Sequence, residues 1–200
     1  MKPIVGIIMR LDDSRSFLKN EVLNYVIQSG GIPIGIYQSN NITDEIITLC
    51  DGFIFQGGDE FTNYDLDLMK KLIDIKKCVL GICLGMQTMA VSIGGTLNEM
   101  HNLKHLSSAE YVHSINIDSN SKLYNILGNK TIMVNSRHKD NIKGTNMFVS
   151  AISEDGIIEA VELKNYPFFI GVQWHPESLN DINSKNLFDS FILACKGVHK

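Results

Sequence analysis

The chain has 200 residues, of which 44% are hydrophobic and 20% are charged, and its formal net charge is −4. These values are ordinary for one globular domain, which we expect to span residues 1–200. The acidic balance gives no support to nucleic-acid binding, because such binding needs cations that neutralise phosphates. A small-molecule ligand fits this composition better.

The first half of the chain alternates short apolar runs with segments of helical periodicity. Strands are predicted at residues 4–9, 32–37, 52–56 and 78–82, and helices at 17–29, from 43 or 44 onward, at 66–75 and at 85–93. Strands that alternate with helices in this way predict a parallel sheet covered on both faces.

The second half is richer in strands. They are predicted at residues 111–117, 131–135, 147–152, 157–162 and 168–173, before a final helix at 183–195. The segment Ser153-Glu154-Asp155-Gly156 indicates a hairpin, because Asp-Gly supplies the positive φ that tight turns need. We therefore expect the sheet to become mixed.

Membrane and secreted proteins find no support in the sequence. Residues 1–6 begin a short apolar run that Arg10 and Asp12 soon follow, which is not a cleavable signal pattern. No apolar stretch approaches the roughly 20 residues that a membrane-spanning helix needs. We expect a cytoplasmic protein that does not bind a membrane.

The four cysteines show no CxxC spacing and no histidines at zinc-finger distances, so the sequence indicates neither a metal nor a disulfide framework. Cys50, Cys78 and Cys195 are typical of small buried hydrophobic residues. Cys83 differs, because it lies between Gly81 and Gly85 at the junction of a predicted strand and helix. This pattern predicts a nucleophile elbow, whose strained turn lifts the thiol off the sheet and whose helix favours the reactive thiolate. A core cysteine beside two packing glycines is the alternative for the motif alone.

Trp174-His175-Pro176-Glu177 follows the predicted strand at 168–173. The strand period of two would put His175 and Glu177 side by side. A thiol nucleophile needs an imidazole to move protons, and the imidazole needs an anion that fixes its orientation. A single strand-end histidine is more often structural, but together with Cys83 the pair predicts a catalytic triad.

Gly57-Gly58 follows the strand at 52–56 and by itself is typical of a turn. The backbone N–H groups of Gly58 and Leu84 are predicted to form an oxyanion hole beside Cys83. Loops at the carboxyl ends of parallel strands share one crevice, so Gly58, Cys83 and His175 should meet there. Three polar residues after the first strand are expected at the mouth of this crevice: Arg10, Asp12 and Asp13.

These segments, in this order, resemble the class I glutamine amidotransferase superfamily over nearly the whole chain. Within it, the sequence is similar to the γ-glutamyl-γ-aminobutyrate hydrolase family. This likeness is carried by Gly94-Gly95-Thr96-Leu97, Val134-Asn135-Ser136-Arg137-His138, Ser150-Ala151 and Asp155-Gly156-Ile157-Ile158-Glu159-Ala160. The resemblance implies a flavodoxin-like three-layer α/β fold with a central, mostly parallel sheet and an antiparallel extension. It also implies that Cys83, His175 and Glu177 cleave a γ-glutamyl amide through a thioester, with no metal or organic cofactor.

The same resemblance implies that the α-amino and α-carboxylate groups of the glutamyl moiety bind Gln87, Ser136, Arg137 and His138. His101, His105 and His113 resemble positions near a loop of the family, where solvated or structural roles are the expectation.

Three departures from the family concern the leaving group. The segment after Gly58 is shorter than in many relatives, Asp140 replaces a frequent glutamine, and Leu84 replaces a common arginine. Three cations gather on one segment and suggest an anionic leaving group, carboxylate-bearing or phosphorylated: Arg137, Lys139 and Lys143.

The sequence therefore predicts a cysteine hydrolase that acts on a small γ-glutamyl compound. One alternative is a glutaminase subunit that delivers ammonia to a partner synthetase, and another is a non-catalytic sensor of γ-glutamyl ligands. The sequence leaves the oligomeric state open, with a homodimer as one arrangement.

Overall fold

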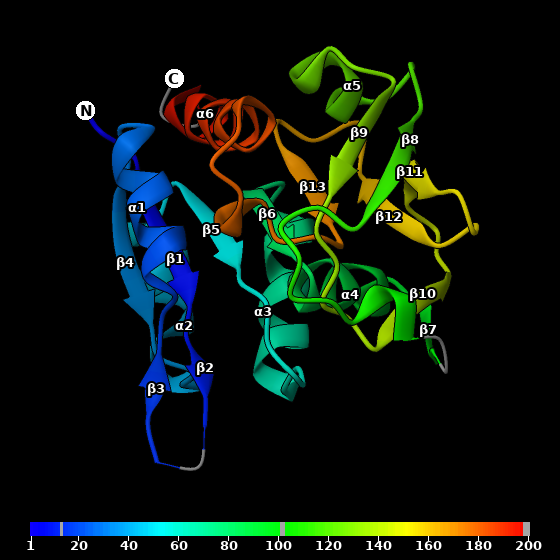
Figure 1. The fold of residues 1–200 in the computed structure, drawn as a ribbon. Coiled ribbons are helices and arrows are strands. Elements are labelled where there is room, and N and C mark those ends of the chain that lie inside the picture. The colour runs from blue at the N-terminus through cyan, green and yellow to red at the C-terminus, as the bar shows by residue number, and fades with distance from the viewer. Residues whose placement is uncertain (13, 101–102, 198–200) are drawn as a thin grey trace.

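A computed structural model describes residues 1–12, 14–100 and 103–197. Its main feature is a nine-stranded sheet in the order β4-β1-β5-β6-β13-β12-β11-β8-β9 (Figure 1). Five neighbouring strands are parallel: β4 (Ile32–Ile36), β1 (Ile4–Ile8), β5 (Gly52–Phe55), β6 (Cys78–Ile82) and β13 (Phe169–Val172). Four strands continue the sheet antiparallel: β12 (Ile158–Glu162), β11 (Phe148–Ser153), β8 (His113–Ile117) and β9 (Thr131–Val134). The predicted α/β class, with a parallel core and an antiparallel extension, is confirmed.

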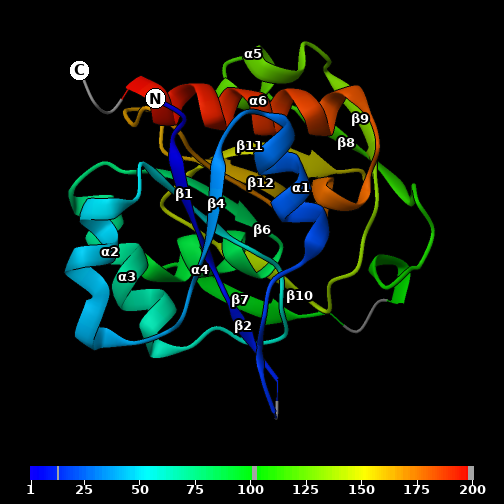
Figure 2. The same ribbon diagram turned by 90° about the vertical axis from the view of Figure 1, so that its left-hand side faces the viewer.

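Helices cover both faces of the sheet. One face carries α1 (Asn20–Gln28), α5 (Lys122–Leu127) and α6 (Ile182–Lys196), whose apolar residues share a core with Leu80 of β6. The other face carries α2 (Thr43–Leu49), α3 (Asn63–Asp74) and α4 (Leu84–Ser92), which pack on the side of Val79. Figure 2 shows α2 and α3 on one side of β4 and β1, and α1 on the other.

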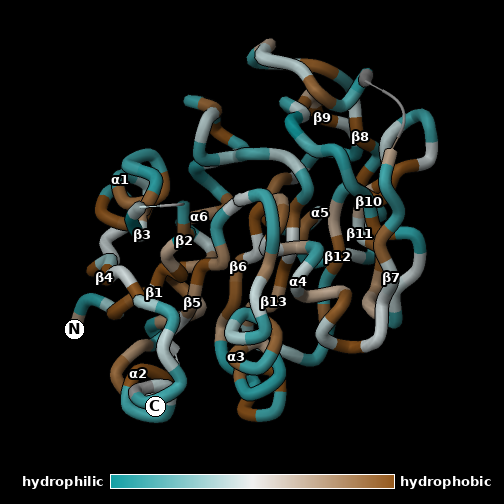
Figure 3. Tube along the Cα trace, turned by 90° about the horizontal axis from the view of Figure 1, so that it is seen from below, coloured by the Kyte–Doolittle hydropathy of each residue, from teal (hydrophilic) through white to brown (hydrophobic). Residues whose placement is uncertain are grey.

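The central strands are apolar along their whole length because both of their faces are covered. All five residues of β6 and all four of β5 are buried. These strands are mostly brown in the hydropathy colouring, whereas the loops around them are mostly teal (Figure 3). Each fully buried large apolar side chain contributes about 1.5–3 kcal/mol to the stability of the fold. This packing fixes the ends of the central strands and the loops that follow them.

The structure also contains elements that the sequence did not predict. Two small sheets pair β2 (Arg10–Leu11) with β3 (Ser16–Phe17), and β7 (Thr96–Glu99) with β10 (Asp140–Gly144). Their strands are too short or too exposed to show a clear alternation. Helix α5 was also missed, although Ser121 caps its start and Gly128, at φ 72°, ends it.

The predicted hairpin between β11 and β12 is confirmed, with Gly156 at φ 85°. Three 3-10 turns complete the elements, at Asn40–Ile42, Leu103–His105 and Pro176–Ser178. No helix among residues 1–12, 14–100 and 103–197 is long and apolar enough to cross a membrane.

Candidate active site

Cys83 occupies a sharp turn between β6 and α4, with φ 53° and ψ −106°. Such a conformation costs a non-glycine residue about 1–3 kcal/mol and persists only where its surroundings enforce it. A Cβ atom at Gly81 would lie 2.7 Å from the carbonyl carbon of Gly85, and one at Gly85 would lie 2.0 Å from the carbonyl oxygen of Phe55. The two glycines are therefore required for the strand and the helix to approach, and the predicted elbow geometry is confirmed.

His175 and Glu177 are buried, and the His175 Nδ1 lies 2.7 Å from the Glu177 Oε1. The strand period is not the reason for this contact, because β13 ends at Val172 and Glu177 lies in the 3-10 turn Pro176–Ser178. The proximity that we predicted is present, but the turn produces it. An ionised carboxylate can only accept, so His175 donates through Nδ1 and keeps Nε2 for chemistry.

Gly57 lies next to both His175 and Cys83. A Cβ atom at Gly57 would lie 2.7 Å from the Cε1 of His175 and 3.5 Å from the Cβ of Cys83. The imidazole and the cysteine therefore meet over the loop after β5, at the carboxyl ends of β5, β6 and β13, as the sheet rule predicts.

The electrostatics of the site favour a charged imidazole. Burial acts to lower the pKa of His175, but hydrogen bonding to Cys83 and Glu177 outweighs burial and raises the pKa to about 9. Burial acts to raise the pKa of Glu177, but the hydrogen bond and the charge of His175, with a contribution from Lys19, outweigh burial and lower it. At neutral pH the pair is therefore an imidazolium and a carboxylate.

Gly58 and Leu84, which were predicted to form the oxyanion hole, are neighbours, because a Cβ atom at Gly58 would lie 3.2 Å from the Cδ2 of Leu84. An open cavity of about 530 Å³ reaches Gly58 and has Arg10 and Asp12 in its wall. The Arg10 guanidinium is itself fixed, since it donates to the backbone oxygen of Gln56 and to both oxygens of Asp65 at 2.8–3.0 Å. Asp13 lies outside the described residues.

The residues predicted to hold the glutamyl group are placed in different ways. The Gln87 side chain donates to the backbone oxygen of Asp140 at 3.0 Å and to the Oε1 of Gln173 at 3.2 Å. Ser136 and His138 are buried, and both contact His105. Arg137 is exposed, donates to Ser178 at 3.1 Å and lines a cavity of about 420 Å³ that also includes Glu177. His101 lies outside the described residues.

Three residues that the sequence analysis did not single out support the triad. The Lys19 Nζ lies 3.4 Å from the Glu177 Oε1, and the Gln173 side chain donates to the Cys83 sulfur at 3.5 Å. Asn135 holds the backbone of His175 from both sides, because its side chain accepts from the N–H and donates to the C=O, each at 2.8 Å. Asn135 belongs to a segment that carries the family resemblance, but no local pattern predicts any of these contacts, since each joins segments at least 40 residues apart.

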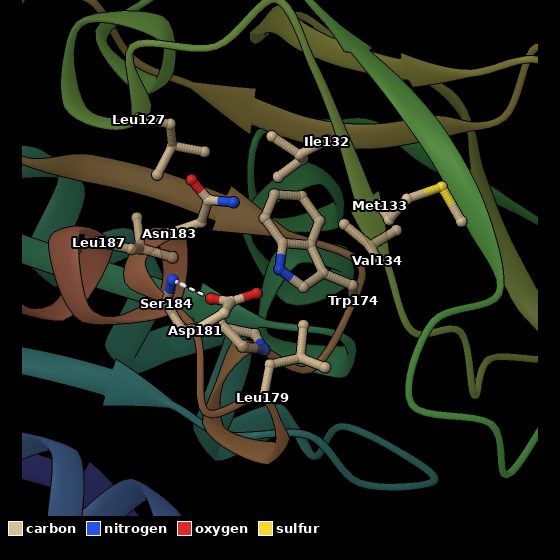
Figure 4. A pocket seen from close by; sticks show the side chains of 11 residues that line it. Leu127, Ile132, Met133, Val134, Trp174, Leu179, Asp181, Asn183, Ser184 and Leu187 are labelled. Carbon is tan, nitrogen blue, oxygen red and sulfur yellow. Dashed lines mark hydrogen bonds between the residues drawn. The ribbon is translucent and has the colours of Figure 1, made fainter.

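Trp174 anchors the chain beside His175. Its indole packs between β9 and the start of α6, among Ile132, Val134 and Leu179 (Figure 4). The space left there is only about 10 Å³, so it holds no ligand larger than a water molecule. This packing fixes the position of the histidine in the chain.

The chain is similar to known proteins over most of its length. The chain is 30% identical to a glutamine amidotransferase-like protein of Rickettsia prowazekii, over 90% of this chain and 89% of the relative. It is 27% identical to the gamma-glutamyl-gamma-aminobutyrate hydrolase of Escherichia coli K12, over 97% of this chain and 94% of the relative. A solved structure from Thermoplasma acidophilum, described as a GMP synthase component, has the same fold, with a TM-score of 0.78 at 19% identity, and the match covers 100% of this chain and 96% of that one.

The family model of Peptidase C26 matches residues 62–177, which is more than half of the chain and includes Cys83, His175 and Glu177. The chain therefore belongs to the Peptidase C26 family of class I glutamine amidotransferase-like proteins.

Proposed function

We propose that the protein is a cysteine hydrolase that cleaves a γ-glutamyl amide bond through a γ-glutamyl thioester. The observation that carries this proposal is the strained Cys83 beside an imidazole that Glu177 orients. The relatives named as gamma-glutamyl-gamma-aminobutyrate hydrolases support the type of bond.

In the first step the Cys83 thiolate attacks the γ-carbonyl carbon and forms a carbon–sulfur bond, while the carbonyl oxygen takes up the negative charge. Backbone N–H groups of Gly58 and Leu84 are the proposed donors to this oxygen. Glycine suits position 58 because a Cβ atom there would crowd the Cδ of Arg10, at 3.0 Å, and the Cδ2 of Leu84, at 3.2 Å.

In the second step the carbon–nitrogen bond breaks, and the leaving amine takes a proton from His175. A histidine with a pKa near 9 is protonated at neutral pH and is ready to act as this acid. The neutral imidazole then removes a proton from water, which attacks the thioester. Glutamate leaves, the thiolate returns, and His175 is again an imidazolium.

A covalent trap tests the nucleophile. A chloroketone analogue of glutamine should label wild-type protein once, at Cys83, and should not label Cys83→Ala. Cys50→Ala is the matched control, because Cys50 is also buried but lies far from the triad residues, in the core beside α3. Labelling of the Cys83→Ala variant at the wild-type rate would refute the proposed nucleophile, and an unlabelled but ligand-binding wild type would favour the sensor.

A glutaminase subunit would have the same triad, but it would need a synthetase for full activity. The hydrolase is favoured by the segments 134–138 and 155–160, which carry the resemblance to the hydrolase family. The purified chain, tested alone, should release glutamate from a γ-glutamyl amide faster than from glutamine. The opposite preference would favour the glutaminase reading.

The charges around the site bear on the leaving group. Arg137, beside the cavity that includes Glu177, supports the anionic leaving group that we expect from the sequence. The cavity at Gly58 instead has acidic residues in its wall, among them Asp12, Asp59 and Glu60. A panel of amides with carboxylate, neutral and ammonium leaving groups separates the two cavities. With Arg137 at the leaving group, Arg137→Gln should raise the KM for the carboxylate amides alone, whereas a rise for all three amides would place Arg137 at the glutamyl α-carboxylate. Equal turnover of all three would remove the anionic preference.

A further inference from the structure

A second cluster of titratable side chains lies on the antiparallel side of the sheet, between β8, β12 and the loops that precede β8 and β10. His105, His138 and Glu159 are buried, and His113 is half-buried. The Glu159 Oε1 lies 3.1 Å from His113 Nε2, 3.7 Å from His138 Nε2 and 3.8 Å from His105 Nδ1. His105 Nδ1 and His138 Nε2 lie 3.2 Å apart.

The hydrogen bonds outside the cluster fix the tautomers of two of these histidines. The His138 Nδ1 lies 3.0 Å from the backbone oxygen of Asp140, which can only accept, so this nitrogen carries a proton. The His105 Nε2 lies 3.0 Å from the Oδ2 of the Asp155 carboxylate, which can only accept. This nitrogen also carries a proton. The two nitrogens that face each other therefore present lone pairs when the rings are neutral.

Lone pairs at this separation repel unless a positive group lies between them. The Ser136 hydroxyl reaches His105 Nδ1 at 3.0 Å, but it has one proton and also bonds the backbone oxygen of His105. Glu159 adds a negative charge, and its Oε2 is buried without a hydrogen-bond partner. A buried carboxylate oxygen and two facing lone pairs are an arrangement that calls for a cation.

We propose that His105, His113, His138 and Glu159 bind a divalent transition metal ion of the zinc type. Imidazole nitrogens and a carboxylate are the donors that such ions accept. Tetrahedral bonds of about 2.0–2.1 Å place neighbouring donors about 3.3 Å apart, and the separations of 3.1–3.8 Å in the cluster lie close to this value. The ligand atoms of His105, His113 and Glu159 all lie within 4.8 Å of one another, so the wider pairs must contract around an ion, and His138 must move with them.

The surroundings fit this assignment. His105 donates its outer N–H to a carboxylate, and His138 donates its outer N–H to a backbone carbonyl, which is how metal-bound imidazoles are usually oriented. Half-buried His113 and the partly exposed Asp155 give an ion access from solvent. The spacing of the ligands along the chain gives no metal-binding pattern, because they come from four separate segments.

The cluster is connected to the triad on two sides. Asn135, which clamps His175, is only three residues from His138. The backbone oxygen of Glu159 accepts from the N–H of Gln173, whose side chain reaches the Cys83 sulfur. A metal here would brace both segments and would act on structure, not on the substrate.

Metal content tests the proposal without any substrate. Untagged full-length protein is loaded with Zn²⁺, dialysed against metal-free buffer and measured by elemental analysis, and it should retain one ion per chain. Added Zn²⁺ should raise the Tm by about 5–10 °C at a free concentration roughly 100-fold above its Kd. Co²⁺ in place of zinc should give the visible absorption of a tetrahedral site, which a proton-bridged cluster cannot give.

Variants locate the ion. Glu159→Gln and His113→Ala should each lose the retained metal and the Tm rise, with folding checked by circular dichroism. Cys83→Ala and His175→Gln are the controls, because a thiol and an imidazole can also hold zinc, and both should retain one ion. Wild-type protein that keeps no metal and shows no Co²⁺ spectrum overturns the proposal, as does metal that is lost from the two controls.

Discussion

Replacing Gly57 with alanine tests whether the position of His175 controls the site. The new Cβ would lie 2.7 Å from the Cε1 of His175, whereas Lys19 Nζ and Cys83 Cβ, at 3.4 and 3.5 Å, are at ordinary contact distances. All three neighbours are side-chain atoms, so the backbone of Gly57 can keep its place. The imidazole must give way instead.

The size of the effect follows from this distance. Ordinary contact begins near 3.4 Å, so the edge of the imidazole must retreat by about 0.7 Å. A misplacement of about 1 Å can cost roughly 100-fold in rate. We therefore expect Gly57→Ala to slow the reaction by about 10–100-fold, which corresponds to about 1.4–2.7 kcal/mol of activation free energy.

Alkylation of Cys83 by iodoacetamide measures the effect without knowledge of the substrate, because the thiolate is the reactive form and the rate is sensitive to the charged group beside it. Gly144→Ala is the matched control, since its Cβ would meet only Thr96 Oγ1, at 3.7 Å. The control should react at the wild-type rate. A Gly57→Ala variant that reacts equally fast, with an unchanged Tm, would refute the close contact between His175 and Gly57.

Three further predictions concern stability. The pKa of His175 rises from 6.5 to about 9 on folding. This shift stabilises the folded protein by about 3 kcal/mol, and the stabilisation is fully present below about pH 6.5. It is lost as the pH rises through 9. Urea unfolding between pH 6 and 10 should show this decline in wild type and a flatter profile in His175→Gln; identical profiles would contradict the pKa. Asn135→Ala removes two buried hydrogen bonds to the His175 backbone and should lower the free energy of unfolding by about 2–4 kcal/mol in the same assay. Alkylation of Cys83 should also slow down. An unchanged alkylation rate would argue against a positioning role for Asn135. Arg10→Met should lower the free energy of unfolding by about 3–5 kcal/mol, because it leaves Asp65 buried without a cationic partner. Adding Asp65→Leu should recover part of this loss. No recovery would mean that the role of Asp65 in capping α3 dominates.

The sequence predicted those parts of the structure that depend on neighbouring residues. The apolar runs located every strand of the large sheet to within a few residues. In β5, β6 and β13 the runs are unbroken because both faces of the strand are buried, whereas β8 and β9 keep polar or exposed positions. The elbow at Cys83 was visible because its two glycines are adjacent to the strained residue. The proximity of His175 and Glu177 was predicted for the wrong reason, since a turn replaced the strand.

Contacts between distant segments were beyond the sequence. Lys19 reaches Glu177 across 158 positions, and no periodicity or spacing connects them. β7 and β10 pair across a separation of about 40 residues, with exposed side chains that give no alternation. The contact between His138 Nε2 and His105 Nδ1, at 3.2 Å, was likewise beyond the sequence, because the two residues lie 33 positions apart. Substrate binding by His138 stays a prediction.

Lys19 completes the charge balance of the site. The mechanism requires a thiolate at Cys83, which faces the imidazolium of His175. The Glu177 carboxylate lies between this imidazolium and the Lys19 ammonium, whose Nζ is 3.4 Å from Glu177 Oε1. Two cations then balance two anions, so a neutral amide can approach without electrostatic cost. In the proposed mechanism, one negative and one positive charge disappear together when the acyl-enzyme forms and the leaving amine takes the proton of His175. The site is therefore neutral before and after the first half-reaction, and this balance depends on a lysine that no motif contains.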